Sequence, residues 1–157
     1  MQIKLPYDTA KPIAGEASIE IDKTSEEVFD FIGVRFYENY PKWAQEVVHF
    51  EPLDGTEVFV GAKAKQTRKD YGDAIESIFA ITDFQPHDLL AFEGVNAPYK
   101  NTYKLESPQT SLSTRLTFRF ELLEVELFMR PFQKLIRTAI EEGAENIVGN
   151  IKNLLVA

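Results

Sequence analysis

The sequence predicts an α+β domain in which a curved antiparallel sheet of six or seven strands wraps around a long C-terminal helix. Two observations indicate this architecture. Between residues 47 and 122, short runs of alternating apolar and polar residues are separated by turn signals rich in Gly, Pro, Asn and Asp. The stretch from Phe128 to Leu155 instead repeats apolar residues at steps of three and four, the spacing of one helix face. That helix is the only predicted element long enough to cover the sheet.

The composition limits the possible functions. The chain has 157 residues, 44% hydrophobic and 27% charged, which is typical of one soluble globular domain. Its net charge of −8 argues against a nucleic-acid or anionic-membrane partner, and no apolar run is long enough for membrane insertion. The N-terminus lacks the apolar core of a signal peptide, so the cytoplasm is the expected location. The oligomeric state stays open.

Cofactor and metal signatures are not found. Cysteine is absent, and the only histidines, His49 and His87, lack the spacing of a zinc site. The sequence contains no GxSxG, Walker or GxGxxG motif. We therefore predict no metal and no cofactor.

The N-terminal part predicts an arm, a strand and a first short helix. Residues 1–16 contain two prolines and a glycine and are interpreted as an N-terminal arm, in which Ile3 to Leu5 could form an edge strand. Residues 17–157 form the single predicted domain, which begins with alternation from Ala17 to Ile21. Thr24 or Ser25 can then cap a helix whose first turn is acidic and which ends near Gly33.

An aromatic segment follows at residues 34–46, where Pro41 limits the structure to one or two short helical turns. Two interpretations of its aromatic residues stay open. They either fill one end of the core or form a lid over the mouth of a pocket. The aromatic residues are Phe36, Tyr37, Tyr40 and Trp43.

Six strands are predicted after this segment, at residues 47–51, 62–69, 74–84, 89–95, 99–105 and 112–122. In the second of them, Lys63, Lys65 and Lys69 cannot all face a core, so Gln66 and Arg68 point inward. A β-bulge in this strand would reverse that phase.

The long helix carries a glycine within its apolar stripe. With Ile136 at the centre of the stripe and about 100° per residue, Gly143 lies within about 20° of the centre line, and Ile136, Ile140 and Ile147 are expected to be buried. Glycine inside a helix costs about 1 kcal/mol relative to alanine. Gly143 therefore either permits close contact with a neighbouring backbone or leaves a dent for a ligand.

The order of these elements resembles the helix-grip family, also called START-like or SRPBCC, and in particular its polyketide cyclase/dehydrase-like branch. The resemblance lies in residues 18–32, in Tyr40-Pro41-Lys42-Trp43, in residues 83–90 and in the terminal helix. It implies a β-α-α-β6-α grip around a ligand tunnel. Members bind lipids, sterols, plant hormones, polyketide intermediates or quinones, and some catalyse cyclisation or dehydration. The resemblance implies no catalytic residue here, because the family shares none.

Polar residues on inward-facing strand positions are the candidate ligand contacts. An inward-pointing arginine needs an anion, a carboxylate or water, so Arg68 either belongs to an internal salt bridge or anchors the polar end of a ligand. The predicted binding residues are Arg68, Gln66, Tyr99, Asn101, Tyr103, Phe118, Trp43, Tyr40, Phe132, Ile136, Ile140 and Gly143.

Three functions fit these observations. The first is a binding module that carries or senses a small hydrophobic or amphipathic molecule between the sheet and the C-terminal helix. The second is a polyketide cyclase/dehydratase-like enzyme, in which Arg68 and a tyrosine would polarise a carbonyl. The third is a protein-interaction domain with a filled core.

Overall fold

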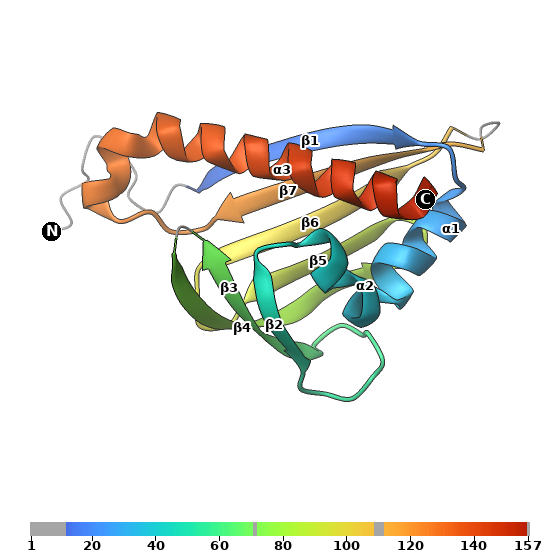
Figure 1. The fold of residues 1–157 in the computed structure, drawn as a ribbon, viewed down its shortest axis with the longest axis horizontal. Coiled ribbons are helices and arrows are strands. Elements are labelled where there is room, and N and C mark those ends of the chain that lie inside the picture. The colour runs from blue at the N-terminus through green and yellow to red at the C-terminus, as the bar shows by residue number, and fades with distance from the viewer. Residues whose placement is uncertain (1–11, 71, 109–111, 157) are drawn as a thin grey trace, which may run out of the picture.

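The computed structural model describes residues 12–70, 72–108 and 112–156 and confirms the predicted α+β architecture. A seven-stranded antiparallel sheet with the order β1-β7-β6-β5-β4-β3-β2 curves beneath a long C-terminal helix (Figure 1). The strands are β1 (Ile13–Ile21), β2 (Val47–Pro52), β3 (Lys63–Asp70), β4 (Asp73–Gln85), β5 (Leu89–Gly94), β6 (Tyr99–Glu106) and β7 (Thr114–Leu122).

The first strand begins earlier than the sequence predicts. Ile13 to Glu16, expected in the N-terminal arm, belong to β1, where Ile13 lies opposite Leu122 of β7 and Gly15 lies opposite Phe120. Pro12 and Gly15 conceal the alternation in the sequence, but pairing with β7 satisfies this backbone. The edge strand expected at Ile3 to Leu5 lies outside the described residues.

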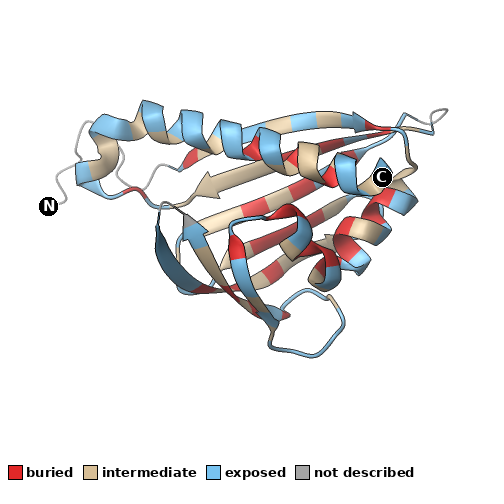
Figure 2. Cartoon of the chain, in the orientation of Figure 1, coloured by how far each residue is buried: buried red, intermediate tan, exposed pale blue. Residues whose placement is uncertain are grey.

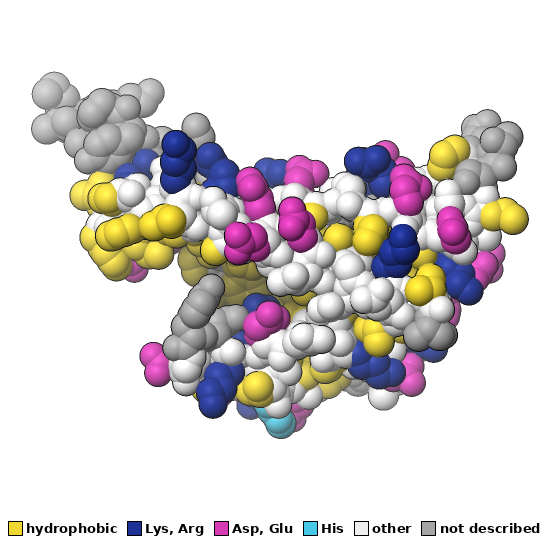
Figure 3. Space-filling model, turned by 45° about the horizontal axis from the view of Figure 1, so that its top comes forward, with side chains coloured by type: hydrophobic (Ala, Val, Ile, Leu, Met, Phe, Trp, Pro, Cys, Tyr) yellow, Lys and Arg dark blue, Asp and Glu magenta, His cyan; other side chains and the backbone are white. Residues whose placement is uncertain are grey.

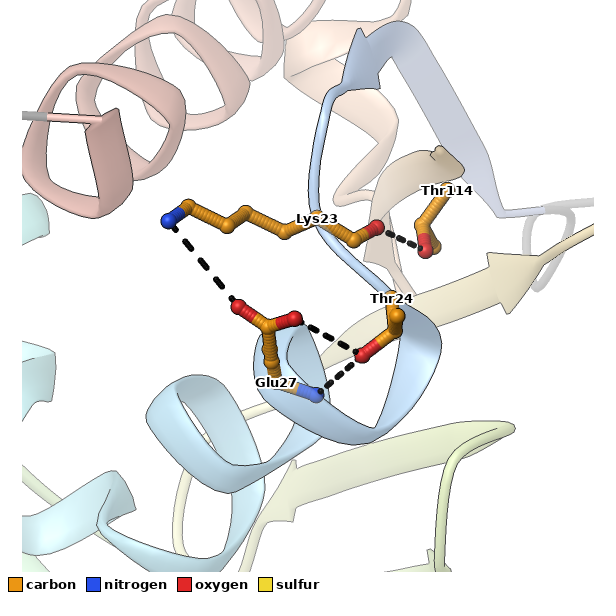
Figure 4. Close-up of polar contacts among 4 residues, drawn as sticks. All are labelled: Lys23, Thr24, Glu27 and Thr114. Carbon is orange, nitrogen blue, oxygen red and sulfur yellow. Dashed lines mark hydrogen bonds and ion pairs between the residues drawn. The ribbon is translucent and has the colours of Figure 1, made fainter. Parts of the chain in front are cut away.

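Two short helices and one π-helical turn follow β1. They are α1 (Ser25–Phe29), the π-turn η1 (Asp30–Val34) and α2 (Phe36–Trp43). The Thr24 hydroxyl accepts a hydrogen bond from the Glu27 amide at 3.2 Å, so Thr24 is the N-cap of α1 (Figure 4). In the same close-up, the Thr114 hydroxyl donates to the Lys23 carbonyl at 2.8 Å and ties this junction to β7.

The C-terminal helical segment has two parts. A 3-10 segment, η2 (Leu127–Phe132), precedes α3 (Gln133–Val156), so the regular helix begins after Pro131 instead of containing it. Proline has no N–H to donate within a helix, and its ring restricts the backbone of the preceding residue. Both effects favour a separate first segment. No helix in the described part of the chain is long and apolar enough to cross a membrane.

The long helix lies over the β1–β7 edge of the sheet (Figure 1). The helix comes very close to Gly15 of β1, where an added Cβ would lie 2.8 Å from Ile140 Cγ2 and 3.2 Å from the Glu141 backbone nitrogen. Glycine is therefore needed at position 15 because a side chain would separate the helix from the strand.

The rotation of the helix differs from the prediction. Its buried residues are Ala144, Val148 and Ile151, roughly 90° around the helix from Ile136. The expected buried residues Ile136, Ile140 and Ile147 are instead half-buried.

The N-terminal half of α3 is mostly exposed or half-buried, whereas its C-terminal half faces the core (Figure 2). The apolar stripe is wide enough to allow either orientation. Packing against Gly15 and the core below selects the observed one.

A dense aromatic cluster fills the part of the grip under the C-terminal half of α3. Phe36, Tyr40 and Trp43 of α2 are each at most 1% exposed. Their rings pack on the central strands. The distance between ring centroids is 5.4 Å for Phe36 and Phe92 and 5.7 Å for Trp43 and Tyr103. The segment therefore fills the core as in the first interpretation, and the lid interpretation is wrong for these three residues.

Candidate functional site

The candidate site is a cavity of about 170 Å³ at the end of the grip that the aromatic cluster leaves open. The lining residues come from β3, β6 and β7 and are Gln66, Arg68, Tyr99, Asn101 and Phe120. β6 begins at Tyr99 and β7 ends just after Phe120, so both residues lie at the same end of the sheet. The β3–β4 hairpin, close to Arg68, also lies at that end. Figure 3 shows a hollow between the N-terminal end of α3 and this hairpin, with hydrophobic side chains on its floor.

Arg68 reaches the cavity because the predicted phase of β3 is retained. Ala64 and Gln66 on the same face are buried, whereas Lys63 and Lys69 are exposed. A register irregularity does occur, but it lies in β2 between Val47 and His49 and leaves β3 regular.

The charge of Arg68 is partly compensated at the cavity rim. Arg68 Nη2 lies 3.9 Å from Glu46 Oε2, and the two side chains are 33% and 45% exposed. An ion pair with this separation and this degree of solvent exposure contributes little to stability. Glu46 reduces the net positive charge that a ligand would meet, which favours a neutral polar group over a strong anion.

A chain of hydrogen bonds connects the cavity wall to the aromatic cluster. The Tyr40 hydroxyl donates to Gln66 Oε1 at 2.7 Å, and Gln66 Nε2 donates to the Tyr99 hydroxyl at 3.1 Å. The Tyr99 and Ser77 hydroxyl oxygens lie 3.0 Å apart. These contacts fix the orientation of the Gln66 amide, so the wall is rigid on this side.

Asn101 presents a buried acceptor in the cavity wall. The residue is 5% exposed, and its Oδ1 atom has no hydrogen-bond partner in the structure. Leaving a buried acceptor unpaired costs about 1–3 kcal/mol. Because the Asn101 residue lines the cavity, a small turn of its side chain would let this acceptor pair with a donor on a bound molecule.

The tyrosines around the site are neutral hydrogen-bonding groups. Burial raises the pKa of Tyr40 and of Tyr103 well above the ordinary value, although the nearby Arg68 charge acts in the opposite direction. Burial also raises the pKa of Tyr99, against hydrogen bonds from Ser77 and Gln66. The five lining residues include no carboxylate or imidazole, so the lining offers no general base for neutral pH.

The structure brings four of the predicted site residues together and places the others elsewhere. Gln66, Arg68, Tyr99 and Asn101 line the cavity. Four others, Tyr40, Trp43, Tyr103 and Phe118, belong to the aromatic core and do not line it.

The predicted helix contacts also lie outside the cavity lining. Phe132 is 55% exposed, and Ile136 and Ile140 are half-buried. Gly143 is exposed, and an added Cβ there would meet nothing within 4 Å. Neither interpretation of Gly143 is therefore correct: it faces solvent, because the helix is rotated relative to the expected stripe.

Three contributors to the site were missed. Phe120 lines the cavity and stacks on Tyr99 with centroids 6.3 Å apart, and its inward phase follows from the alternation of β7. Ser77 lies on a strand with apolar residues in both phases, so the sequence pattern does not indicate which face of the sheet it occupies. Glu46 comes from the turn before β2, where sequence patterns do not define side-chain direction.

A second hollow lies outside the grip, between α1–η1 and the β4–β5 turn. It measures about 410 Å³ and is lined by Glu26, Glu27, Phe29, Asp30, Val34, Pro86 and His87. Its acidic side chains are exposed on the helix surface. We regard the smaller cavity as the site because its polar groups are buried and converge.

The curved sheet and the long C-terminal helix that crosses it define a helix-grip protein of the START-like, SRPBCC class. Residues 12–155 match the family described as polyketide cyclase / dehydrase and lipid transport, and the chain belongs to that family. No curated protein shows significant similarity to the sequence.

Solved structures share the fold. A protein from Thermus thermophilus is 14% identical with a TM-score of 0.72, over 91% of this chain and 97% of its own. The Zhui aromatase/cyclase from Streptomyces sp. R1128 is 10% identical with a TM-score of 0.73, over 92% and 94%. The major latex-like protein 151 from Panax ginseng is 11% identical with a TM-score of 0.66, over 92% and 99%. At these identities the likeness concerns the fold alone.

Proposed function

We propose that this protein binds a small amphipathic molecule, with its polar end in the cavity between β3, β6 and β7. The observation that carries the proposal is the unpaired, buried Oδ1 atom of Asn101 in the wall of the cavity that Arg68 also lines. A ligand hydroxyl can donate to Asn101 while its oxygen accepts from Arg68. The family description, which includes lipid transport, is consistent with this function.

The dimensions of the cavity define the ligand further. A protein cavity of about 150 Å³ can hold a benzene molecule, so about 170 Å³ accommodates one ring bearing a small polar substituent. The stacked pair of Tyr99 and Phe120 offers an aromatic wall for such a ring. The apolar remainder of a larger ligand would extend into the hollow beneath the N-terminal end of α3. The ligand is therefore a phenol-like or hydroxylated ring, alone or as the end of a lipid.

Catalysis of the cyclase or dehydratase kind is the second candidate. It is supported by the family description and by neutral tyrosine hydroxyls close to a guanidinium. Proton abstraction in such a reaction needs a base, and the five lining residues do not supply one near neutral pH. We therefore place binding ahead of catalysis.

Titration with phenol and toluene, followed by amide NMR shifts, tests the proposal. The two probes share a ring of similar size and differ in the hydroxyl. Phenol is expected to bind more tightly and to shift the amides around Gln66 and Asn101. In Arg68→Met, phenol binding should weaken by roughly 1.5–3 kcal/mol, the range for a hydrogen bond to a charged group, whereas toluene binding should not change.

Lys69→Met is the matched control because Lys69 neighbours Arg68 and points to solvent. It should leave both titrations unchanged. Equal affinities for phenol and toluene in the native protein would contradict the proposal. Unchanged phenol affinity in Arg68→Met, together with a large loss of stability, would assign Arg68 to a structural ion pair.

A further inference from the structure

The hydrogen bonds in the cavity wall all run in one direction. Arg68 donates to the oxygen of Tyr40. The Tyr40 hydroxyl donates to Gln66 Oε1 at 2.7 Å, and Gln66 Nε2 donates to the Tyr99 oxygen at 3.1 Å. The chain of hydrogen bonds therefore begins at a cation that can only donate and ends at a hydroxyl group on the cavity lining.

Arg68 determines this direction because a guanidinium has no acceptor atom. Tyr40 is 1% exposed, so the hydrogen of its hydroxyl needs an acceptor inside the protein. The Gln66 amide can accept only through its oxygen, which therefore turns toward Tyr40. The amide nitrogen then faces Tyr99, whose oxygen has to accept. Gln66 thus transmits the polarity of Arg68 to Tyr99.

The hydroxyls of Tyr99 and Ser77 together carry one hydrogen more than the wall can pair. Their oxygens lie 3.0 Å apart, so one of the two hydrogens lies between them. The Tyr99 oxygen already accepts from Gln66. Ser77 is 6% exposed, and within the described part of the chain its hydroxyl has no second hydrogen-bond partner. The other hydrogen of the pair is therefore left without an acceptor among the described residues.

A bound molecule can satisfy that hydrogen in only one of two arrangements. Tyr99 lines the cavity, whereas Ser77 is not among the lining residues. If Tyr99 donates to Ser77, the unpaired hydrogen belongs to Ser77, away from the lining. If Ser77 donates to Tyr99, the unpaired hydrogen belongs to Tyr99, and a ligand oxygen that accepts it removes the cost of an unpaired donor. A ligand with an acceptor therefore selects the second arrangement.

We infer that Gln66 is a positioning residue that makes the Tyr99 hydroxyl a hydrogen-bond donor to the ligand. The ligand hydroxyl of the proposed function pairs with Asn101 and Arg68, so the Tyr99 hydrogen requires a second oxygen. The ligand is then a hydroxylated ring that also carries a neutral acceptor, such as an ether oxygen. This inference rests on the proposed function and adds the second substituent to it.

Amide NMR titrations with matched phenols test the inference. 3-Methoxyphenol and 3-ethylphenol have the same number of non-hydrogen atoms, but only the first has a second oxygen, and that oxygen can only accept. Resorcinol carries a second hydroxyl, which can also donate. Hydroquinone and the 4-methoxy and 4-ethyl phenols form a second series. The measured quantity is the affinity of each probe divided by that of the ethylphenol in its series. Comparing this ratio between variants cancels the different hydration of the probes.

Tyr99→Phe removes the donor and keeps the ring that stacks on Phe120. In at least one series the methoxyphenol ratio should fall about 2- to 12-fold, the value of one neutral hydrogen bond.

Gln66→Glu keeps the shape of the side chain but reverses the polarity. Its carboxylate, which Arg68 and two hydroxyl donors keep ionised, accepts from both Tyr40 and Tyr99. The Tyr99 hydrogen is then no longer available, and its oxygen can accept from a ligand instead. In the series that responds to Tyr99→Phe, the methoxyphenol ratio should therefore fall and the ratio for the dihydroxybenzene should rise. A purely structural role of Gln66 would lower all affinities alike.

Two control variants remove other hydroxyls. Ser77→Ala should keep the native methoxyphenol ratio or raise it, because the Tyr99 hydrogen remains. Tyr37→Phe removes a tyrosine hydroxyl outside the cavity lining and should leave every ratio unchanged. Circular dichroism and cooperative thermal melting establish that the variants fold.

The inference is overturned if Tyr99→Phe leaves the methoxyphenol ratio unchanged in both series, or if Ser77→Ala lowers it as much as Tyr99→Phe does. It is also overturned if Gln66→Glu does not move the two ratios in opposite directions. A native preference for phenol over toluene, with ratios that do not depend on Tyr99, would reject this inference alone. Equal phenol and toluene affinities, with ratios that do depend on Tyr99, would reject only the proposed pairing of the ligand hydroxyl with Arg68 and Asn101.

Discussion

Replacing Asn101 with leucine should make the protein more stable and less able to bind a polar ligand. The two side chains have nearly the same shape, so the change removes polar atoms without a large change in volume. The unpaired Oδ1 atom costs about 1–3 kcal/mol in the native protein, and Asn101→Leu removes that cost. The hydrogen bond between Asn101 and Tyr103 is lost and offsets about 1 kcal/mol.

The expected net gain in free energy of unfolding is about 1 kcal/mol, equivalent to about 2–4 °C in melting temperature for a chain of this length. Urea unfolding and thermal melting measure it. The same variant should bind phenol more weakly and toluene at least as well. Such an exchange of stability for function is common at binding sites.

Asn39 provides the matched control because it is also buried, but both polar atoms of its amide have hydrogen-bond partners. Its Nδ2 donates to the Phe31 carbonyl at 2.9 Å, and its Oδ1 accepts from Lys42 at 3.1 Å. Asn39→Leu should therefore cost about 1–3 kcal/mol. If Asn101→Leu destabilises the protein as much as Asn39→Leu does, Asn101 is a satisfied core residue and our interpretation of the cavity is wrong.

Two further predictions concern glycine and pH. Gly15→Ala should destabilise the protein by about 1–3 kcal/mol, because the new Cβ would lie 2.8 Å from Ile140 Cγ2. Gly143→Ala should stabilise it by about 0.5–1 kcal/mol, since the new Cβ would meet nothing within 4 Å. Equal effects of the two variants in urea unfolding would contradict the position of the helix. The contribution of the Tyr40 hydroxyl to the free energy of unfolding should be constant below the ordinary tyrosine pKa of 10.0 and should fall above it, because the raised pKa of Tyr40 keeps it protonated only when folded. Between pH 9 and 11, the free energy of unfolding of Tyr40→Phe should fall by about 1.4 kcal/mol less than that of the native protein. Equal decreases would contradict the burial of the Tyr40 hydroxyl.

The strands and their facing were predictable because alternation is a local property. β7 alternates along its whole length, and the lysines of β3 determine that Gln66 and Arg68 face inward. The phases of β6 likewise direct Tyr99 and Asn101 inward, so four of the five lining residues could be chosen from the sequence. The structure adds their convergence on one cavity.

The rotation of α3 could not be predicted because it depends on a contact between distant residues. The apolar stripe of the segment allows several orientations, and in the structure Ile140 packs against Gly15 of β1. The size of the cavity depends on how Phe36, Tyr40 and Trp43 pack, which periodicity does not describe. As a result, the predicted tunnel along the helix is reduced to a cavity at one end.

The uneven packing of α3 has a consequence for motion. All of its buried residues, Ala144, Val148 and Ile151, lie from the middle of the helix onward, so the first turns are held by few buried apolar contacts. A segment of this kind can open locally at a small fraction of the free energy of global unfolding. The aromatic core would stay intact during such an opening. Under the proposed function, a ligand would therefore enter or leave at one end on the timescale of local fluctuations, without the slow cooperative unfolding that a fully buried site would require.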